Sequence, residues 1–421
     1  MSIHRTPEGK YRAKWRDPSG RQRSRNFATK RDARDFLAEI QRALTSGQYV
    51  DPHSGRTCFA AHATAWLDSR NTEDTTAARD QSVMKTHVLP QWGNWPLGKI
   101  DHAAVQAWVT DLGRVRSVEV VAKCYQLTSA VLRSAVRNRL IAFNPCDGVR
   151  LPRRRKRAKD ERIIDRQDVL TRLLPAAPDR YRAIIATAAG TGLRWGEAAG
   201  LCADALDLER GFLQVIRTVV EVSGRTAFKL YPKSDAGRRT IPLPDWLIPI
   251  LREHTARYQP GRAGLIFPNQ VGMPLRRTLF RSRVWRPTLV KAGLLGSVTE
   301  LEAVTDSGDR YRAIWTTDTG DTATATFRTY AQAVKHLARH AGQALRFHDL
   351  RHSYATWLVD DEVPPNMVQR VMGHEHVSTT LQLYVRRTEH HDRIRQALNT
   401  TIVAPDDPDD DGVTGVLIPI G

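Results

Sequence analysis

The sequence predicts an α+β protein of several domains, and three observations support this. Residues 1–55 combine a stretch of alternating polar and apolar positions with a helical segment, whereas residues 56–150 show helical periodicity only. Residues 163–400 mix long helical segments with a few strands, and a basic run at 151–162 precedes them. We therefore expect a small hairpin-plus-helix module, a helical domain, and a mixed, mainly helical domain with a small antiparallel sheet.

The composition indicates a polyanionic partner. The chain has 421 residues, a formal net charge of +19 and a pI of about 10.2. A chain this basic is typical of nucleic-acid-binding proteins. We expect double-stranded DNA to be the partner.

Other partners and compartments are disfavoured. No apolar run reaches the ~18 residues of a membrane span, and the first residues lack the apolar core of a signal peptide. These features predict a cytoplasmic protein without membrane contact. The four cysteines are widely separated and form no C-x-x-C pair, so we expect neither a zinc site nor a disulfide framework.

Residues 1–55 predict a β-hairpin that turns at residues 17–20, followed by a helix with Thr29 as its N-cap. Against one acid, Asp17, the hairpin carries six basic residues: Arg12, Lys14, Arg16, Arg21, Arg23 and Arg25. A two-stranded ribbon is narrow enough to enter a major groove, so we expect this module to bind DNA. The alternative is a small solvated module with a basic face.

Residues 56–150 predict four helices, which can form a small bundle and which end at Asn144-Pro145. The linker at 151–162 then carries five consecutive cations: Arg153, Arg154, Arg155, Lys156 and Arg157. Like charges in a row repel one another unless an anion lies beside them. We expect this basic linker to contact DNA, and a solvated linker is the alternative.

The third domain begins near Ile163 with helical segments. Two strands follow, at 211–222 and 224–244, joined by Ser223-Gly224. Lys233 lies in the turn YPKSDAGRRTIPL after the second strand. Taken alone, a lysine in such a loop is simply solvated.

The stretch from Arg346 to Tyr384 concentrates groups that could carry chemistry. The spacing of apolar residues in HDLRHSYATWLV predicts a helix, which places His348 and Arg351 on one face. A guanidinium, imidazoles and a phenol without clustered carboxylates suit a phosphate better than a metal. We expect Tyr384 to attack phosphorus and form a covalent intermediate. Taken one at a time, His348, His374 and Tyr384 would be ordinary structural residues.

Three segments together resemble the active-site boxes of the tyrosine recombinases, the phage integrase family. TAAGTGLRWGEAAGL, residues 187–201, is similar to the first box, with Arg194 in the arginine position and Glu197 in the acidic position. HDLRH is similar to the second box, and MGHEHVSTTLQLY resembles the third, with His374 and the nucleophile Tyr384. The boxes occur in the family's order, and the resemblance covers roughly residues 57–400. It identifies residues 1–55 with the arm-type DNA-binding module and residues 56–150 with the core-binding domain.

The resemblance implies a site-specific recombinase that cuts and rejoins DNA through a 3′-phosphotyrosine, integrating and excising a prophage or another mobile element. Arg194 and Arg351 would hold the non-bridging oxygens of the phosphate, and His374 would donate a further hydrogen bond. Glu197 would support them by orienting His348 or a neighbouring arginine.

The family also implies the proton transfers. Lys233 would protonate the 5′-hydroxyl leaving group, and His348 would assist proton transfer with Tyr384. The phosphotyrosyl bond preserves the energy of the phosphodiester, so we expect no metal, no ATP and no other cofactor.

The expected assembly is a homo-tetramer on attachment-site DNA in a bacterial host cell, associated with the nucleoid when bound. A directionality or DNA-bending protein could accompany it. Two alternatives remain. The first is a DNA-binding protein with a decayed active site, but the presence of all the motif residues argues against it. The second is a type IB topoisomerase, which shares the chemistry.

An internal repeat departs from the family pattern. Residues 311–340 align without a gap to residues 11–40, and a third of the positions are identical. We expect residues 297–345 to be an inserted hairpin-plus-helix module, with chance similarity as the alternative. Four arginines of the first copy are replaced in the second by Thr316, Asp321, Ala323 and Ala325. Because phosphate contacts dominate affinity for DNA, this copy should not bind DNA.

Residues 401–421 form an Asp-rich run followed by the apolar VLIPI. The acidic part predicts disorder. The apolar end either adds to a sheet edge or a neighbouring protomer, or is merely a tail.

Overall fold

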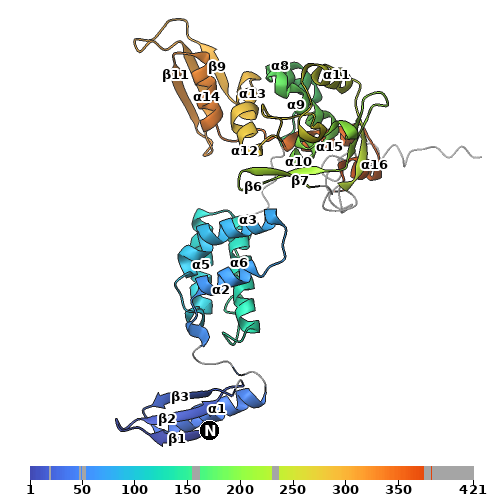
Figure 1. The fold of residues 1–421 in the computed structure, drawn as a ribbon. Helices are drawn as coiled ribbons and strands as arrows, with labels where there is room; N and C mark the ends of the chain where they lie inside the picture. Colours follow the sequence, from blue (N-terminus) through green and yellow to red (C-terminus); the bar gives the residue numbers. More distant parts are fainter. Residues whose placement is uncertain are drawn as a thin grey trace, which may run out of the picture. The chain divides into compact units, whose positions relative to one another are not determined.

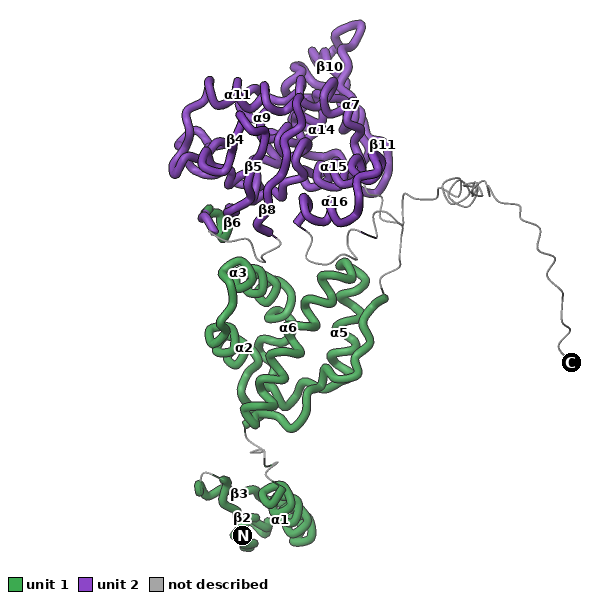
Figure 2. The backbone as a smooth tube through the Cα atoms, turned by 90° about the vertical axis from the view of Figure 1, so that its right-hand side faces the viewer, with its two compact units in different colours: residues 1–160, 220–226 green, residues 161–219, 227–421 purple. Residues whose placement is uncertain are grey.

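The computed structural model describes residues 1–18, 20–46, 49, 54–153, 162–229, 237–373 and 381. The chain divides into two compact units, residues 1–160 with 220–226 and residues 161–219 with 227–421 (Figure 2). Among the described helices, none is both long enough and apolar enough to cross a bilayer.

The N-terminal module is a three-stranded antiparallel sheet with one helix on it (Figure 1). Its elements are β1 (Ser2–Arg5), β2 (Tyr11–Arg16), β3 (Gln22–Phe27) and α1 (Lys30–Thr45). The predicted hairpin and helix are confirmed, and the Thr29 side chain caps α1 by accepting from the Asp32 backbone N–H at 3.1 Å. β1 is not predicted by the sequence, since its four residues have no apolar alternation to mark a strand.

The N-terminal module has its own small core. Ala13 and Trp15 of β2 pack against Ala33, Leu37 and Ile40 of α1. Side chains alternate along a strand, so the neighbouring residues of β2 point to the opposite, uncovered face of the sheet.

The helical region has the four helical segments that the sequence predicts, and they enclose a core around Phe59, Trp92, Trp108 and Leu132. The segments are α2 (Phe59–Asp68), α3 (Asp74–Val83) continued by a π-helical turn (Met84–Val88) and α4 (Leu89–Trp92), α5 (His102–Val115), and α6 (Val118–Arg137).

The third region is mainly helical, as predicted. Its helices are α7 (Arg166–Asp168), α8 (Leu174–Ala176), α9 (Asp179–Thr191), α10 (Trp195–Ala199), α11 (Leu247–Arg257), α12 (Arg277–Phe280), α13 (Arg286–Lys291), α15 (Asp349–Asp360) and α16 (Pro365–Met372). Buried residues of α9, α13 and α15, among them Ile184, Leu289 and Leu350, meet in one core.

The strands of this region differ from the prediction. The stretch 211–222 forms two strands in different sheets: β5 (Phe212–Val215) and β6 (Thr218–Val222). β5 lies between β4 (Leu206–Asp207) and β8 (Arg239–Pro242), whereas β6 pairs with β7 (Arg225–Lys229) in a separate hairpin. Arg217 lies in the break between the two strands, where its guanidinium donates to both carboxylate oxygens of Asp204, at 2.7 and 2.5 Å.

The inserted repeat has the same fold as the N-terminal module. Its elements are β9 (Ser297–Glu300), β10 (Tyr311–Thr316), β11 (Thr322–Phe327) and α14 (Tyr330–His340), with the strands in the order β11-β10-β9 (Figure 1). The register also repeats, because Tyr311 pairs with Phe327 as Tyr11 pairs with Phe27. Residues 301–310 make the first connection longer than its counterpart at 6–10.

The insert is built into the core of the third region. The Trp285 Nε1–H donates to the Leu345 carbonyl at 2.7 Å, and the buried Arg286 guanidinium donates to the carbonyls of Ala338 and Ala341 at the end of α14. Trp315 and Leu337 belong to the same apolar cluster as the core of that region. The N-terminal module, by contrast, has a core of its own.

Candidate active site

Two left-handed glycines end the helices that border the site. Gly192 (φ +62°) ends α9, and Gly373 (φ +59°) ends α16. A Cβ at position 192 would lie 2.5 Å from the Tyr354 ring, so this position requires glycine for space as well as for its dihedral angle. The turn at Gly192 brings the next residues of the chain, Leu193 and Arg194, to the start of α10.

Arg194 is the N-cap residue of α10, and Glu197 fixes it in place. The Arg194 backbone N–H donates to Glu197 Oε2 at 2.9 Å, and its Nη1–H donates to Glu197 Oε1 at 2.9 Å. The Arg194 side chain remains 42% exposed. A guanidinium that is held at one edge and open at the other is suited to an anionic ligand.

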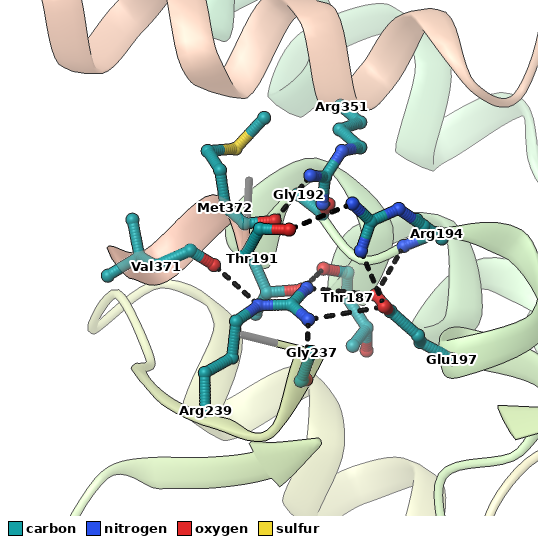
Figure 3. Close-up of polar contacts among 11 residues, drawn as sticks. Thr187, Thr191, Gly192, Arg194, Glu197, Gly237, Arg239, Arg351, Val371 and Met372 are labelled. Carbon is teal, nitrogen blue, oxygen red and sulfur yellow. Dashed lines mark hydrogen bonds and ion pairs between the residues drawn. The ribbon is translucent and has the colours of Figure 1, made fainter. Parts of the chain in front are cut away.

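Glu197 also binds a second arginine, Arg239 at the start of β8 (Figure 3). Arg239 donates from Nη2 to Glu197 Oε2 at 2.8 Å and from Nη1 to Oε1 at 3.1 Å. Burial by itself raises the pKa of Glu197, but the hydrogen bonds and charge of Arg239, together with Arg194, outweigh burial and lower that pKa to about 2. Glu197 is therefore ionised at neutral pH.

Arg351 lies on α15 and is 4% exposed. Its Nη1–H donates to the Gly192 carbonyl at 2.7 Å, and its Nη2–H donates to the Met372 carbonyl. Burial, and then the neighbouring Arg194 charge, lower the pKa of Arg351 to about 9. The guanidinium is still a cation at neutral pH, and an anion placed beside it would stabilise its charge.

The three arginines converge on the end of α16. Arg239 Nε donates to the Val371 carbonyl at 2.7 Å, Arg351 donates to Met372, and Arg194 Nη2 donates to Gly373 at 3.1 Å. The last carbonyls of a helix have no partner within the helix, so cations stabilise them. Arg194 and Arg239 bind the Glu197 carboxylate, and Arg351 interacts with it through its charge, so three cations are balanced by one anion and an excess of positive charge remains for a phosphate.

His348 precedes α15, and its ring centroid lies 5.1 Å from that of His352. Part of the side chain is open to solvent, but desolvation of the rest, followed by His352 and Arg351, lowers the pKa of His348 to about 4. The ring is therefore neutral near pH 7 and can accept a proton.

The structure thus brings together four of the residues that the sequence singles out: Arg194, Glu197, His348 and Arg351. Lys233, His374 and Tyr384 lie outside the described residues. His374 directly follows Gly373, whose carbonyl accepts from Arg194.

The basic residues expected to bind DNA fall on different faces of the N-terminal module. Arg12, Lys14 and Arg16 alternate with the buried residues of β2 and so share the sheet face away from α1. Arg23 pairs with Asp17 at 3.0 Å, and Arg25 lies over the rings of Phe27 and Phe36 on the helix side. Arg21 is exposed and directly precedes β3. In the linker, Arg153 is exposed, and residues 154–157 lie outside the described part.

Arg239 is not among the site residues predicted from the sequence. The signal was present, because Arg239 and Ile241 alternate with exposed residues in β8 and therefore point to the same buried side. A cation at an inward position of a strand predicts a buried acid opposite it. No spacing along the chain indicates that this acid is Glu197.

Comparisons with known proteins support one family. The family model described as the phage integrase family matches residues 316–391, and that of the phage integrase central domain matches residues 59–151. A prophage phiRv2 integrase of Mycobacterium tuberculosis is 31% identical over 278 residues, which cover 63% of this chain and 72% of that protein.

Solved structures share the fold. The Tn1549 transposon integrase in complex with a circular intermediate DNA matches with a TM-score of 0.57 and 17% identity, over 81% of this chain and 99% of that chain. A lambda integrase tetramer bound to a Holliday junction matches with a TM-score of 0.50 and 15% identity, over 89% and 95%. With the arginine-lined site and the matching relative, these findings show that the chain belongs to the phage integrase family of tyrosine recombinases, enzymes that cut and rejoin DNA.

Proposed function

We propose that this recombinase cuts and rejoins DNA at attachment sites through a covalent bond between Tyr384 and a 3′-phosphate, and so integrates and excises a prophage or another mobile element. The observation that supports this most is the convergence of Arg194 and Arg351 on the helix end that leads into His374. These two fixed cations, with the imidazole of His348 near Arg351, suit the charge that develops on a phosphoryl group in transfer.

The reaction begins when Tyr384 Oη attacks phosphorus. The P–O5′ bond breaks as the P–O bond to tyrosine forms. Arg194 and Arg351 hold the non-bridging oxygens, and His374 donates a further hydrogen bond. Attack by the 5′-hydroxyl of another strand reverses the sequence and completes the exchange.

Two proton transfers accompany cleavage. His348, neutral near pH 7, takes the proton of the Tyr384 hydroxyl, and Lys233 gives a proton to the departing 5′-oxygen. The order reverses on rejoining, so the enzyme returns to its starting protonation state.

The proposed partners are the DNA sites and further copies of the chain. The N-terminal module binds DNA through Arg12, Lys14 and Arg16, and the basic linker at 151–157 adds phosphate contacts. Four protomers assemble on DNA, as in the lambda integrase tetramer on a Holliday junction, and a directionality or DNA-bending protein accompanies them.

A nicked suicide substrate that carries candidate attachment-site DNA tests this function. A covalent protein–DNA adduct should accumulate because the short strand beyond the nick diffuses away. If no adduct forms on DNA that the protein binds specifically, the proposal is wrong. Relaxation of plasmids without site preference would favour a type IB topoisomerase instead.

Removal of metal should leave cleavage unchanged. Arginine and histidine side chains supply the charge that a divalent cation supplies in other phosphoryl-transfer enzymes. We expect the same adduct yield after dialysis against EDTA as before it. Loss of activity that magnesium restores would contradict the proposed mechanism.

The open face of the N-terminal module should carry salt-dependent binding to DNA. Replacing Arg12, Lys14 and Arg16 with alanine in the full chain should weaken binding to DNA. It should also reduce the slope of log K against log salt by about 0.9 for each phosphate that the variant no longer neutralises. Fluorescence anisotropy over a salt series measures this slope.

The inserted repeat provides a matched control. Arg312→Ala changes the position that corresponds to Arg12 at the same place in the register, since Arg312 pairs with Thr326 as Arg12 pairs with Asn26. The aligned neighbours are Ile314 and Thr316, so this face offers one cation and should not bind DNA. An equal reduction of the slope in both variants would contradict the assignment. The full chain is needed because the insert shares its core with the third region.

A further inference from the structure

Arg239 has no role in the proposed chemistry, yet its side chain is buried and makes four hydrogen bonds in the site. Its side chain is 2% exposed. It donates to both oxygens of Glu197, to the Val371 carbonyl and, from Nη1 at 3.2 Å, to the Gly237 carbonyl (Figure 3). A guanidinium has five N–H donors, so these four bonds leave no pair of donors for a phosphate.

We propose that Arg239 is a positioning residue for DNA cleavage, which acts through Glu197 on Arg194 and through the Val371 carbonyl on the chain that enters His374. This inference rests on the proposed function, because it assigns Arg239 to the same reaction. Hydrogen bonds connect Arg239 to the site by two routes.

The first route goes through the carboxylate. Glu197 Oε1 accepts from both Arg194 Nη1 and Arg239 Nη1, and Oε2 accepts from the Arg194 backbone N–H and Arg239 Nη2. Because Arg239 donates a hydrogen bond to each carboxylate oxygen, it fixes the orientation of the carboxylate. Glu197 in turn fixes the backbone and the guanidinium of Arg194, the residue that faces solvent and the phosphate.

The second route goes through the end of α16. The carbonyls of Val371, Met372 and Gly373 accept in succession from Arg239, Arg351 and Arg194. Arg239 is the first of these anchors and comes from a strand, whereas the other two come from the motif segments. Removal of its bond frees the helix end just before His374, and a displacement of about 1 Å can cost about 100-fold in rate.

A buried ion pair can also be purely structural, and pH separates the two possibilities. Among the residues that the structure describes, the charged groups that act on Glu197 are Arg194, Arg239 and Arg351. Without Arg239, burial still raises the pKa of Glu197, but the main opposing partner is gone. Glu197 then takes up a proton as the pH falls and releases Arg194. If Arg239 were only structural, its replacement would lower stability, and the rate of cleavage would gain no dependence on protonation of Glu197.

The test is single-turnover cleavage of the suicide substrate by Arg239→Gln over about pH 5 to 8, within which a raised carboxyl pKa titrates. We expect cleavage about 100-fold slower than wild type at neutral pH. We also expect a new decline on the acidic side that wild type lacks. In Glu197→Gln/Arg239→Gln, this decline should disappear, because nothing is left to titrate.

Arg286→Gln is the matched control. Arg286 is also buried and also donates to carbonyls at a helix end, those of Ala338 and Ala341. Within the described part of the chain it donates no hydrogen bond to a carboxylate, and Asp318 acts on it only through its charge. This variant should lower the melting temperature and leave the shape of the pH profile unchanged. A new acidic decline in Arg286→Gln would show that the decline reports lower stability and would overturn the proposal.

Two further measurements keep the result decisive. If Arg239→Gln does not fold, Arg239→Lys can replace it, because lysine keeps the charge but lacks the paired donors. Arg239→Lys should then show the acidic decline, and Glu197→Gln/Arg239→Lys should not.

The second measurement uses a substrate with a 5′-sulfur leaving group, which needs no proton from Lys233. On this substrate the slower cleavage by Arg239→Gln should persist. Recovery there would mean that Arg239 acts through the Lys233 segment, six residues before it, and would overturn both routes.

The outcomes separate this inference from the proposed function. If the wild-type chain forms no adduct, the proposed function fails. If wild type forms the adduct and Arg239→Gln cleaves with the wild-type pH profile, only the role of Arg239 is wrong.

Discussion

Tyr384→Phe abolishes the covalent adduct and recombination while leaving DNA affinity within a few fold. The phenol oxygen is the proposed nucleophile, and phenylalanine has no oxygen at this position to attack phosphorus. One hydroxyl contributes little to an interface whose affinity comes mainly from phosphate contacts. Adduct formation on the suicide substrate and anisotropy on the intact site measure the two quantities.

The control is another tyrosine near the site. Tyr354 lies on α15, its ring abuts Gly192, and burial raises its pKa to about 12, so it is a poor source of phenolate. Tyr354→Phe should retain cleavage, because it removes a hydroxyl and keeps the ring that packs there. An adduct formed by Tyr384→Phe, or its loss in Tyr354→Phe alone, would contradict the assignment.

Arg194→Ala and Arg351→Ala should each slow cleavage by about 100-fold or more. This is the usual scale for removing one charge partner of a transition state and corresponds to about 2.7 kcal/mol. The effect should fall on the rate of adduct formation at saturating DNA. Single-turnover kinetics measure that rate without a contribution from binding.

Stability has to be separated from chemistry for Arg351. Arg351 also holds the Gly192 and Met372 carbonyls, so its removal should lower the melting temperature more than removal of the half-open Arg194. Arg252→Ala is the surface control: Arg252 pairs with Glu209 at 3.0 Å, both are exposed, and cleavage should stay within about 2-fold. If either Arg194→Ala or Arg351→Ala cleaves at the wild-type rate, that residue does not hold the phosphate.

Much of the local structure could be predicted, and the reason is the strength of short-range signals. The helix that begins after Thr29 carries an N-cap and an apolar stripe, and the hairpin turn at Ser223-Gly224 has two residues with positive φ. The inserted repeat could be predicted because Trp315 and Phe327 repeat the apolar pattern of the first copy. β1 and β9 could not, since four-residue strands at a sheet edge take their conformation from their neighbours.

The sequence by itself determined the class of chemistry: its residue types and the order of its motifs indicate phosphoryl transfer with Arg194 and Arg351 as cations. Only the tertiary structure decided how these cations are held. Arg239 meets Glu197 and Val371 across long distances in the sequence, and hydrogen bonds of that kind leave no local pattern. The same holds for the insert. Its own residues predict its fold, whereas its attachment to the core of the third region depends on Arg286 reaching the end of α14 and on Trp285 reaching the Leu345 carbonyl.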